Sequence, residues 1–204
     1  MDMTRSPPPV PRAEATRTAI VETAERLFRS LGYQKTTVAD IARELRMSPA
    51  NVYRFFPSKA AINEAICARI LDGFDRLAWS IARGPEPAPD RLRLLFRTMQ
   101  RQTMTLFFHD KRMHDMVAAA MEEHWGVIRA YVESFDKALR HILMDGIAAG
   151  VFAPCDADRT SRLMHCTMIG FVHPTLVQEW IDDDLPGLAA DMAELVLRSL
   201  RPEN

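Results

Sequence analysis

Apolar residues recur at helical spacing along most of the chain. In the first such segment, residues 13–31, apolar positions lie three and four residues apart, and Gly32 follows where a helix C-terminus favours glycine. Between residues 58 and 83 the same spacing continues without interruption from Ile62 to Ile81. Alternation with a period of two residues is not sustained anywhere in the sequence. The pattern therefore predicts an all-α protein.

Helix-start signals divide this pattern into nine helices. Ser48 and Ser58 are suitable N-cap residues, and Thr37 with Asp40 has the spacing of a capping box. Pro174 lies inside a later helical segment, which we expect it to kink. The predicted helices cover about residues 13–31, 37–45, 48–55, 58–83, 90–108, 111–122, 124–149, 156–180 and 185–200.

Proline-rich segments suggest how the chain is divided. The segment MDMTRSPPPVPR, residues 1–12, predicts a disordered tail. The segment GPEPAP, residues 84–89, interrupts the helical pattern, and Asp90 is the expected N-cap of the helix that follows. We expect a small helical domain at residues 13–60 and a larger one at residues 61–204.

Charge differs between these two parts, although the whole chain carries only −1. Residues 1–60 contain ten Lys and Arg against six Asp and Glu, whereas the remainder contains 16 against 21. A basic first part suggests a polyanionic partner for it. The three cysteines lack metal-ligand spacing, and no apolar run approaches the roughly 18 residues that span a bilayer. A reduced, cytoplasmic protein without membrane contact is the expectation.

About three residues connect the second and third predicted helices, which is typical of a helix-turn-helix. In that motif, the first residues of the second helix enter the major groove of DNA. Here Pro49, Ala50 and Asn51 are small or hydrogen-bonding. Asparagine can pair with adenine, and Arg54, one turn later, can reach guanine or a phosphate. The residues suited to contact phosphates are Thr36, Thr37, Tyr53 and Lys59.

The segment TTVADIARELRMSPANVYRFFPSKAAI resembles the DNA-binding signature of the TetR family of transcriptional regulators. The similarity covers about residues 13–65 and combines helix spacing, N-caps and the set of Tyr53, Phe56 and Lys59. The resemblance implies phosphate contacts from Thr37, Tyr53 and Lys59. It implies base-facing positions at Ser48, Pro49, Ala50, Asn51 and Arg54.

Arg46 departs from the family pattern, which usually has glycine at this position. A side chain in a left-handed turn residue costs about 1–2 kcal/mol. Either the turn is shaped differently here, or Arg46 is kept for a phosphate contact. The sequence does not decide between these two explanations.

The resemblance also implies a nine-helix TetR-like architecture, with a C-terminal domain for ligand binding and dimerisation. The expected function is that of a transcriptional regulator, a repressor that a small apolar or amphipathic ligand releases from a pseudo-palindromic operator. Two recognition helices in a two-fold dimer would read half-sites about 34–36 Å apart. The last two helices carry a broad apolar surface for a four-helix bundle. The predicted dimer-face residues are Phe171, Thr175, Leu176, Leu188, Met192, Leu195 and Val196.

Methionine and aromatic residues are frequent in the larger predicted domain. Methionine adapts to irregular ligands, so an apolar pocket among these helices is expected, in agreement with the resemblance. A methionine-rich core without a pocket would have the same composition. The predicted pocket-lining residues are Phe96, Met99, Trp125, His165 and Met168.

Metal binding and catalysis find little support in the sequence. His109 and His114, each followed by an aspartate, and the pair His165 and His173 are better explained as solvated or hydrogen-bonded histidines. No glycine-rich phosphate loop or Gly-x-Ser-x-Gly motif occurs, so no cofactor, metal or enzymatic activity is predicted. Two alternatives remain open: a TetR-like DNA binder that needs no ligand, and a helical enzyme or scaffold without a DNA role.

Overall fold

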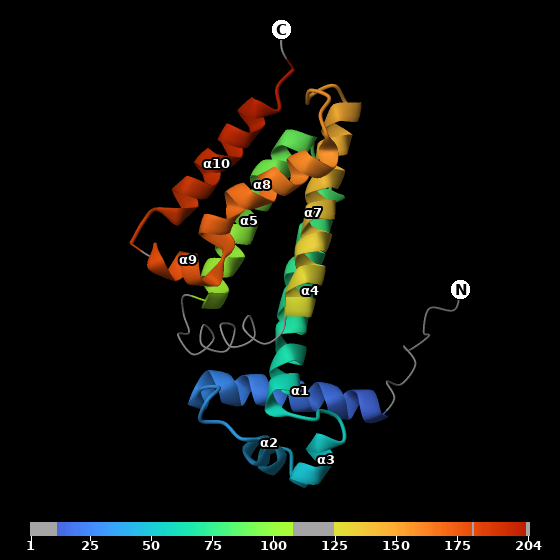
Figure 1. Ribbon diagram of the computed structural model, residues 1–204, viewed down its shortest axis with the longest axis vertical. Coiled ribbons are helices and arrows are strands. Elements are labelled where there is room, and N and C mark those ends of the chain that lie inside the picture. Colours follow the sequence, from blue (N-terminus) through green and yellow to red (C-terminus); the bar gives the residue numbers. More distant parts are fainter. Residues whose placement is uncertain (1–11, 108–124, 181, 203–204) are drawn as a thin grey trace, which may run out of the picture. The chain divides into compact units, whose positions relative to one another are not determined.

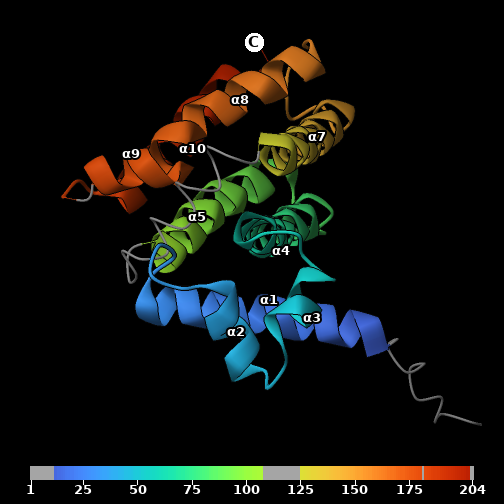
Figure 2. The same ribbon diagram turned by 60° about the horizontal axis from the view of Figure 1, so that its bottom comes forward.

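The computed structural model describes residues 12–107, 125–180 and 182–202, which form α-helices and contain no strand (Figures 1 and 2). The all-α prediction is confirmed, while the predicted helix at 111–122 lies outside the described residues. The helices are α1 (Arg12–Leu31), α2 (Val38–Glu44), α3 (Pro49–Tyr53), α4 (Lys59–Ala82), α5 (Ala88–Phe107), α7 (Trp125–Ala148), α8 (Ala157–Val172), α9 (Pro174–Glu179) and α10 (Leu185–Ser199).

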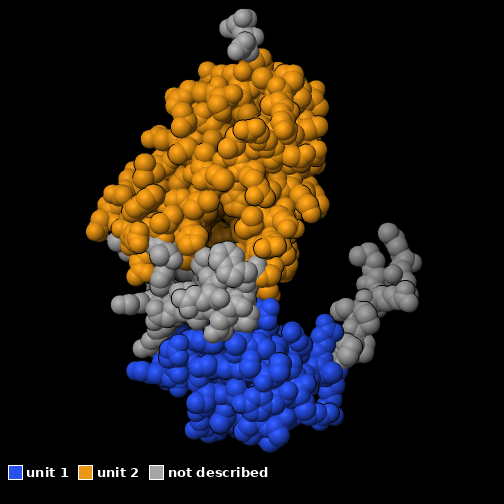
Figure 3. All heavy atoms as spheres, in the orientation of Figure 1, with its two compact units in different colours: residues 1–66 blue, residues 67–204 orange. Residues whose placement is uncertain are grey.

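The chain forms two compact units, residues 1–66 and residues 67–204 (Figure 3). The boundary falls inside α4, later than the expected boundary at residue 60. The reason is the burial of Ile62 and Ile66, which are wholly inaccessible and belong to the first unit.

The first unit consists of α1, α2, α3 and the beginning of α4. Its core contains Phe28 from α1, Ile41 from α2 and Val52 from α3, all wholly buried, together with Phe56. The rings of Phe28 and Tyr33 meet edge to face, with their centroids 5.1 Å apart. Burial of large apolar side chains at helical spacing holds these short helices together, since isolated helices of this length are unstable in water.

The predicted N-caps in this unit are confirmed. The Ser48 hydroxyl oxygen accepts a hydrogen bond from the backbone N–H of Asn51 at 3.3 Å, at the beginning of α3. At the beginning of α4, the Ser58 hydroxyl oxygen accepts one from Ala61 at 3.0 Å. Gly32 follows α1 with φ of +97°, as the sequence predicted for a helix end.

In the second unit α10 packs along α5 and α8, while α7 packs along α8 and α5 (Figure 1). Their apolar faces meet in one core, because each helix has a continuous apolar stripe. The largest wholly buried side chains of this core are Leu92, Leu95, Phe96 and Met99 of α5 and Phe135 of α7.

Two predicted helix boundaries in this unit are wrong. Pro174 separates two helices instead of kinking one, since His173 has an extended backbone with φ of −80° and ψ of 124°. A proline ring disfavours the helical conformation of the preceding residue, which explains the break. The helix α5 begins at Ala88, so Asp90 lies in its first turn and is not its N-cap. An acidic residue is favourable there because of the helix dipole.

Candidate nucleic-acid interface and ligand cavity

The turn between α2 and α3 contains a left-handed arginine. Arg46 has φ of +54° and is the one non-glycine residue with positive φ among the described residues. The Met47 N–H donates to the Ala42 carbonyl at 2.9 Å, and the Arg46 N–H donates to the Arg43 carbonyl at 3.1 Å. This pair of bonds is a Schellman motif, which normally has glycine at the left-handed position. The turn therefore keeps the shape that favours glycine, which excludes one of the two explanations, a differently shaped turn.

Replacing Arg46 by glycine is expected to stabilise the first unit by up to about 1 kcal/mol. Removing the side chain relieves the left-handed strain, partly offset by the greater freedom of glycine in the unfolded chain. Denaturant unfolding followed by circular dichroism measures this change. The matched variant Arg43→Gly, inside α2, should destabilise instead, because glycine is unfavourable within a helix. Equal destabilisation by both variants would show that Arg46 is not strained.

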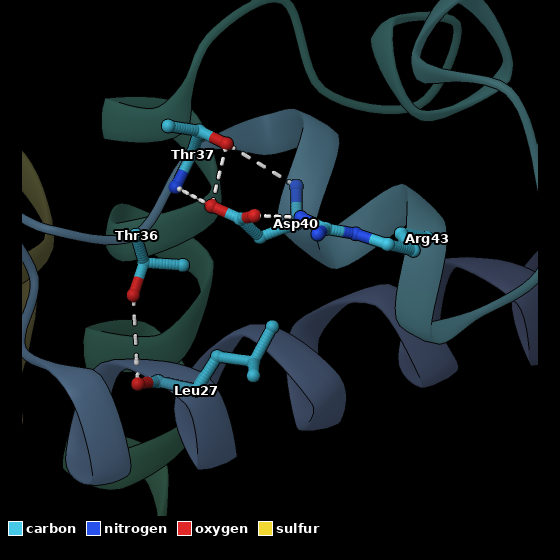
Figure 4. A network of polar contacts seen from close by, with 5 residues as sticks. All are labelled: Leu27, Thr36, Thr37, Asp40 and Arg43. Carbon is cyan, nitrogen blue, oxygen red and sulfur yellow. Dashed lines mark hydrogen bonds and ion pairs between the residues drawn. The ribbon is translucent and has the colours of Figure 1, made fainter.

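A capping box opens α2, as predicted (Figure 4). The Thr37 N–H donates to an Asp40 carboxylate oxygen at 2.9 Å, and the Asp40 N–H donates to the Thr37 hydroxyl oxygen at 3.2 Å. Hydrogen bonds from the Thr37 side chain, and then from its backbone, hold the pKa of the Asp40 carboxyl below its ordinary value. Thr37 is exposed and lies at this fixed helix start. Its predicted phosphate contact stays a prediction.

Thr36, the neighbouring residue, has a different environment. Its side chain is wholly buried, and its hydroxyl donates to the carbonyl of Gly32 at 2.9 Å (Figure 4 shows the hydroxyl directed towards the Leu27 carbonyl). The hydroxyl therefore satisfies carbonyl groups at the end of α1, which lack helical partners. The prediction that this side chain contacts a phosphate is wrong, because a phosphate cannot reach it.

Lys59 fastens the loop between α1 and α2. Its ammonium donates to the carbonyls of Tyr33 at 2.9 Å and of Thr36 at 3.1 Å, and lies 4.4 Å from the centroid of the Tyr33 ring. These contacts give Lys59 a structural role that the sequence did not indicate. Its predicted phosphate contact remains a prediction. Replacing Lys59 would remove this contact and the contacts to the loop together, so a loss of DNA affinity would reflect both.

Most of the other candidate DNA contacts are accessible. Tyr53 is 51% exposed, and Asn51 is half-buried, with its amide donating to the Met47 sulfur at 3.7 Å. The sequence reasoning left out Lys35, an exposed cation just before the start of α2, where helix N–H groups favour anions. The exposed candidates from the third helix and its cap are Ser48, Pro49, Ala50, Tyr53 and Arg54.

A cavity of about 380 Å³ lies within the second unit, among α4, α5, α7, α8 and the start of α9. This volume is in the range of small-molecule sites. Met99 and His165 line the cavity, at positions where the sequence suggested a pocket. Phe96 and Met168 are not among the lining residues and lie in the buried core, and the side chain of Trp125 lies outside the described residues. Its apolar wall includes Ile70, Leu71, Phe74, Leu106, Val132, Phe135, Ile169 and Val172.

Three polar side chains of this wall form a connected group. The His165 ring nitrogen Nδ1 lies 2.6 Å from an Asp136 carboxylate oxygen, and the other carboxylate oxygen lies 3.5 Å from Nε of Arg162. A carboxylate only accepts hydrogen bonds, so His165 Nδ1 carries the proton of that contact. Asp136 is thereby paired with a guanidinium and bonded to an imidazole on the same cavity wall.

His173 is a second polar group on the cavity wall. Its Nδ1 is buried and has no hydrogen-bond partner among the described residues. Burial lowers the pKa of the imidazole below its ordinary value, because the charged form is poorly solvated there. The side chain is therefore neutral near pH 7.

The His173→Gln variant is expected to reduce the acid sensitivity of the second unit. Because the folded-state pKa is lowered, the unfolded chain binds a proton at His173 at higher pH than the folded chain does. The free energy of unfolding should therefore fall as the pH drops below about 6.5. Denaturant unfolding at neutral and mildly acidic pH measures the change. An identical pH dependence in the wild type and the variant would contradict this assignment.

The predicted dimer-face residues fall into separate environments. Phe171 and Val196 are buried in the core of the second unit, and the Phe171 ring centroid lies 6.1 Å from that of Phe96. Their assignment to a dimer face is wrong because neighbouring helices of the same chain already cover them. Leu176 and Met192 are half-buried, and the side chain of Thr175 lies outside the description.

Exposed leucines occupy other positions on α8 and α10. On α10, the predicted residues Leu188 and Leu195 are 48% and 53% exposed. On α8, Leu163 is 57% exposed, although the sequence did not single it out. Large exposed apolar side chains on two adjacent helices are typical of an association surface.

In the described part of the chain, no group of three or more His, Cys, Asp and Glu side chains is arranged to hold a metal ion. His109 and His114 lie outside it. None of the helices there is both long and apolar enough to cross a membrane.

Comparison with known proteins places both units in one family. Residues 20–66 match the family described as bacterial regulatory proteins of the tetR family. Residues 88–196 match the C-terminal domain described as tetracyclin repressor-like. The second match alone covers more than half of the chain.

Individual relatives agree with these matches. The Bacillus subtilis protein YhgD, an uncharacterized HTH-type transcriptional regulator, is 25% identical over 174 residues, covering 79% of this chain and 88% of YhgD. A TetR/AcrR-family regulator from Thermobifida fusca has the same fold, with a TM-score of 0.69 and 21% identity over 92% of this chain and all of that one. The Stenotrophomonas maltophilia repressor SmeT gives a TM-score of 0.68 at 19% identity, covering 94% and 93%. The chain belongs to the tetR family of bacterial regulatory proteins and is a DNA-binding transcriptional regulator.

Proposed function

We propose that this regulator acts in the cytoplasm as a homodimeric repressor, which leaves a pseudo-palindromic operator when a small apolar or amphipathic molecule binds in its cavity. The observation that carries the proposal is the largely apolar cavity of about 380 Å³ in the second unit. SmeT, one of the structural relatives, has been solved in complex with triclosan, which supports ligand binding in a protein of this fold.

A single helix connects the cavity with the DNA-binding unit along the chain. The helix α4 is continuous from Lys59 to Ala82; it begins in the first unit and provides Ile70, Leu71 and Phe74 to the cavity wall in the second. A ligand that binds better to one arrangement of α4 shifts the population towards that arrangement. The two α3 helices of a dimer would then no longer match half-sites about 34–36 Å apart.

The repressor assignment is tested by transcription from the regulator's own promoter. A reporter under this promoter should become more active when the gene for the regulator is deleted. Its activity should fall again when the gene is supplied on a plasmid. Lower activity on deletion would identify an activator instead.

The ligand response is tested on the purified chain. A metabolite library is screened by thermal shift, and each stabilising compound is then tested for release of the operator complex, since ligands that bind the folded state raise its melting temperature. At least one stabilising compound should release DNA. If no compound shifts the melting temperature or releases DNA, the chain is a DNA binder that needs no ligand.

The dimer is proposed to form through α8 and α10, with the exposed Leu163, Leu188 and Leu195 in contact with the second copy. Replacing Leu195 by glutamate should convert the dimer to a monomer in sedimentation experiments, because a charge would be buried without a partner. The control Val151→Glu, at an exposed residue outside these helices, should leave the dimer intact. A dimer that survives both Leu163→Glu and Leu195→Glu contradicts this interface.

A further inference from the structure

We infer that the cavity is built for a weakly acidic amphiphile, with a carboxylic or similarly acidic hydroxyl group next to Asp136, Arg162 and His165, and an uncharged body extending towards His173. This inference rests on the proposed ligand response and adds the chemical class of the ligand.

The polar group of the cavity has a fixed internal arrangement. Asp136 is largely buried, with its side chain 15% exposed, and it uses one carboxylate oxygen for His165 and the other for Arg162. The carboxylate is thus compensated by its own protein partners. Since Nδ1 of His165 donates to Asp136, Nε2 is the ring nitrogen that a ligand can meet.

These contacts favour an acidic ligand over a basic one. A ligand amine would find Asp136, the one carboxylate among the described residues of the cavity wall, already paired with a guanidinium. A ligand acid, by contrast, contacts both His165 and the guanidinium of Arg162. Nε2 of His165 accepts the acid's proton, or donates a hydrogen bond to the ligand once it carries a proton. Among the described residues of the wall, the other polar side chains are those of Cys67, Thr103, Tyr131, Cys166 and His173, and none of them is a carboxylate.

The opposite end of the cavity favours an uncharged group. His165 and Val172 both line the wall, and the seven-residue step between them corresponds to about 10 Å along α8; His173 follows directly after the helix. Between His165 and His173 the α8 side chains facing the cavity include Ile169 and Val172. Burial disfavours the charged form of His173 next to these apolar side chains, and it thereby lowers the pKa of the imidazole. A ligand with one acidic end and an apolar body fits this distribution.

The test uses three probes with the same apolar chain and different polar ends: decanoate, 1-decanol and decylammonium. Each is titrated into the full-length chain near neutral pH, below its aggregation concentration, and binding is measured by calorimetry. Decanoate should bind at least about tenfold more tightly than the other two, as expected for a charge-assisted hydrogen bond.

Variants of the polar group locate the effect. His165→Leu and Arg162→Gln should each weaken decanoate binding by about tenfold and change 1-decanol binding by less than about threefold, which also shows that the cavity is still folded. Arg162→Lys should retain most of the affinity, because it keeps the positive charge. The matched control Arg159→Gln removes a charge from the same helix outside the cavity wall and should leave decanoate binding unchanged.

The inference is overturned if decylammonium or 1-decanol binds as tightly as decanoate, if none of the three probes binds, or if the variants affect decanoate and 1-decanol equally. Operator binding is measured separately by gel shift. An operator complex with no preference for decanoate refutes the ligand class alone. If decanoate binds to the chain but does not release the operator complex, the proposed ligand response is refuted.

Discussion

Ala50→Glu is expected to lower the affinity of the regulator for its operator by at least about 100-fold. Ala50 is exposed in the first turn of α3, the helix expected to enter the major groove. A carboxylate there would lie among phosphates and base acceptor groups without a counter-ion. Helix α3 itself should tolerate the change, because an acidic residue near a helix N-terminus is favourable. Fluorescence anisotropy with labelled operator DNA measures the loss.

The variant Ala50→Gln is the matched control, because glutamine has nearly the same size as glutamate but carries no charge. It should lose at most about tenfold in affinity, since glutamine can hydrogen-bond to bases and carries no charge. Thermal melting of both variants should match that of the wild type. If Ala50→Glu binds the operator as tightly as the wild type does, α3 is not the recognition helix and the proposed DNA-binding face is wrong.

Phe96→Ala is expected to lower the free energy of unfolding of the second unit by about 3–5 kcal/mol. The Phe96 side chain is wholly buried and packs near Phe171, so its removal leaves a void that the surrounding helices cannot fill. Denaturant unfolding at constant pH measures the loss.

Two other variants separate core packing from ligand contact. Met144→Ala, at an exposed position of α7, should change stability by less than about 0.5 kcal/mol. Met99→Leu, on the cavity wall, conserves volume and should cost less than about 1.5 kcal/mol. A loss below about 1 kcal/mol for Phe96→Ala would indicate that this side chain faces an open cavity, as the sequence suggested.

Local chemistry explains what the sequence predicted correctly. The capping box of Thr37 and Asp40 and the N-caps at Ser48 and Ser58 depend on residues three positions apart, so their spacing is visible in the sequence. Such features need no knowledge of the tertiary structure. The sequence leaves the left-handed conformation of Arg46 undecided, because arginine is an unusual residue at the position where glycine is normal.

Features that depend on distant contacts were missed. Thr36 and Thr37 are adjacent and chemically alike, yet the packing of α1 buries only Thr36. The contacts of Lys59 join it to carbonyls 26 and 23 residues earlier in the chain. No short-range pattern predicts such contacts.

The cavity illustrates the same limit. Phe96 and Met99 lie three residues apart on α5, and both are apolar, but only Met99 reaches the cavity wall. The pair of Asp136 and His165 joins residues 29 positions apart on two helices. Which side of a buried helix faces a gap depends on how side-chain volumes fill the core, and spacing alone does not determine this.

The central claim is sequence-specific operator binding by a dimer, and the most direct measurement is titration of the chain onto DNA from upstream of its own gene. A shuffled fragment of the same length and base composition is the competitor. Two chains are expected to bind per site, with at least about 1,000-fold preference for the upstream fragment and an affinity that falls steeply with added salt. Equal affinity for both fragments, or no complex with either, would contradict it.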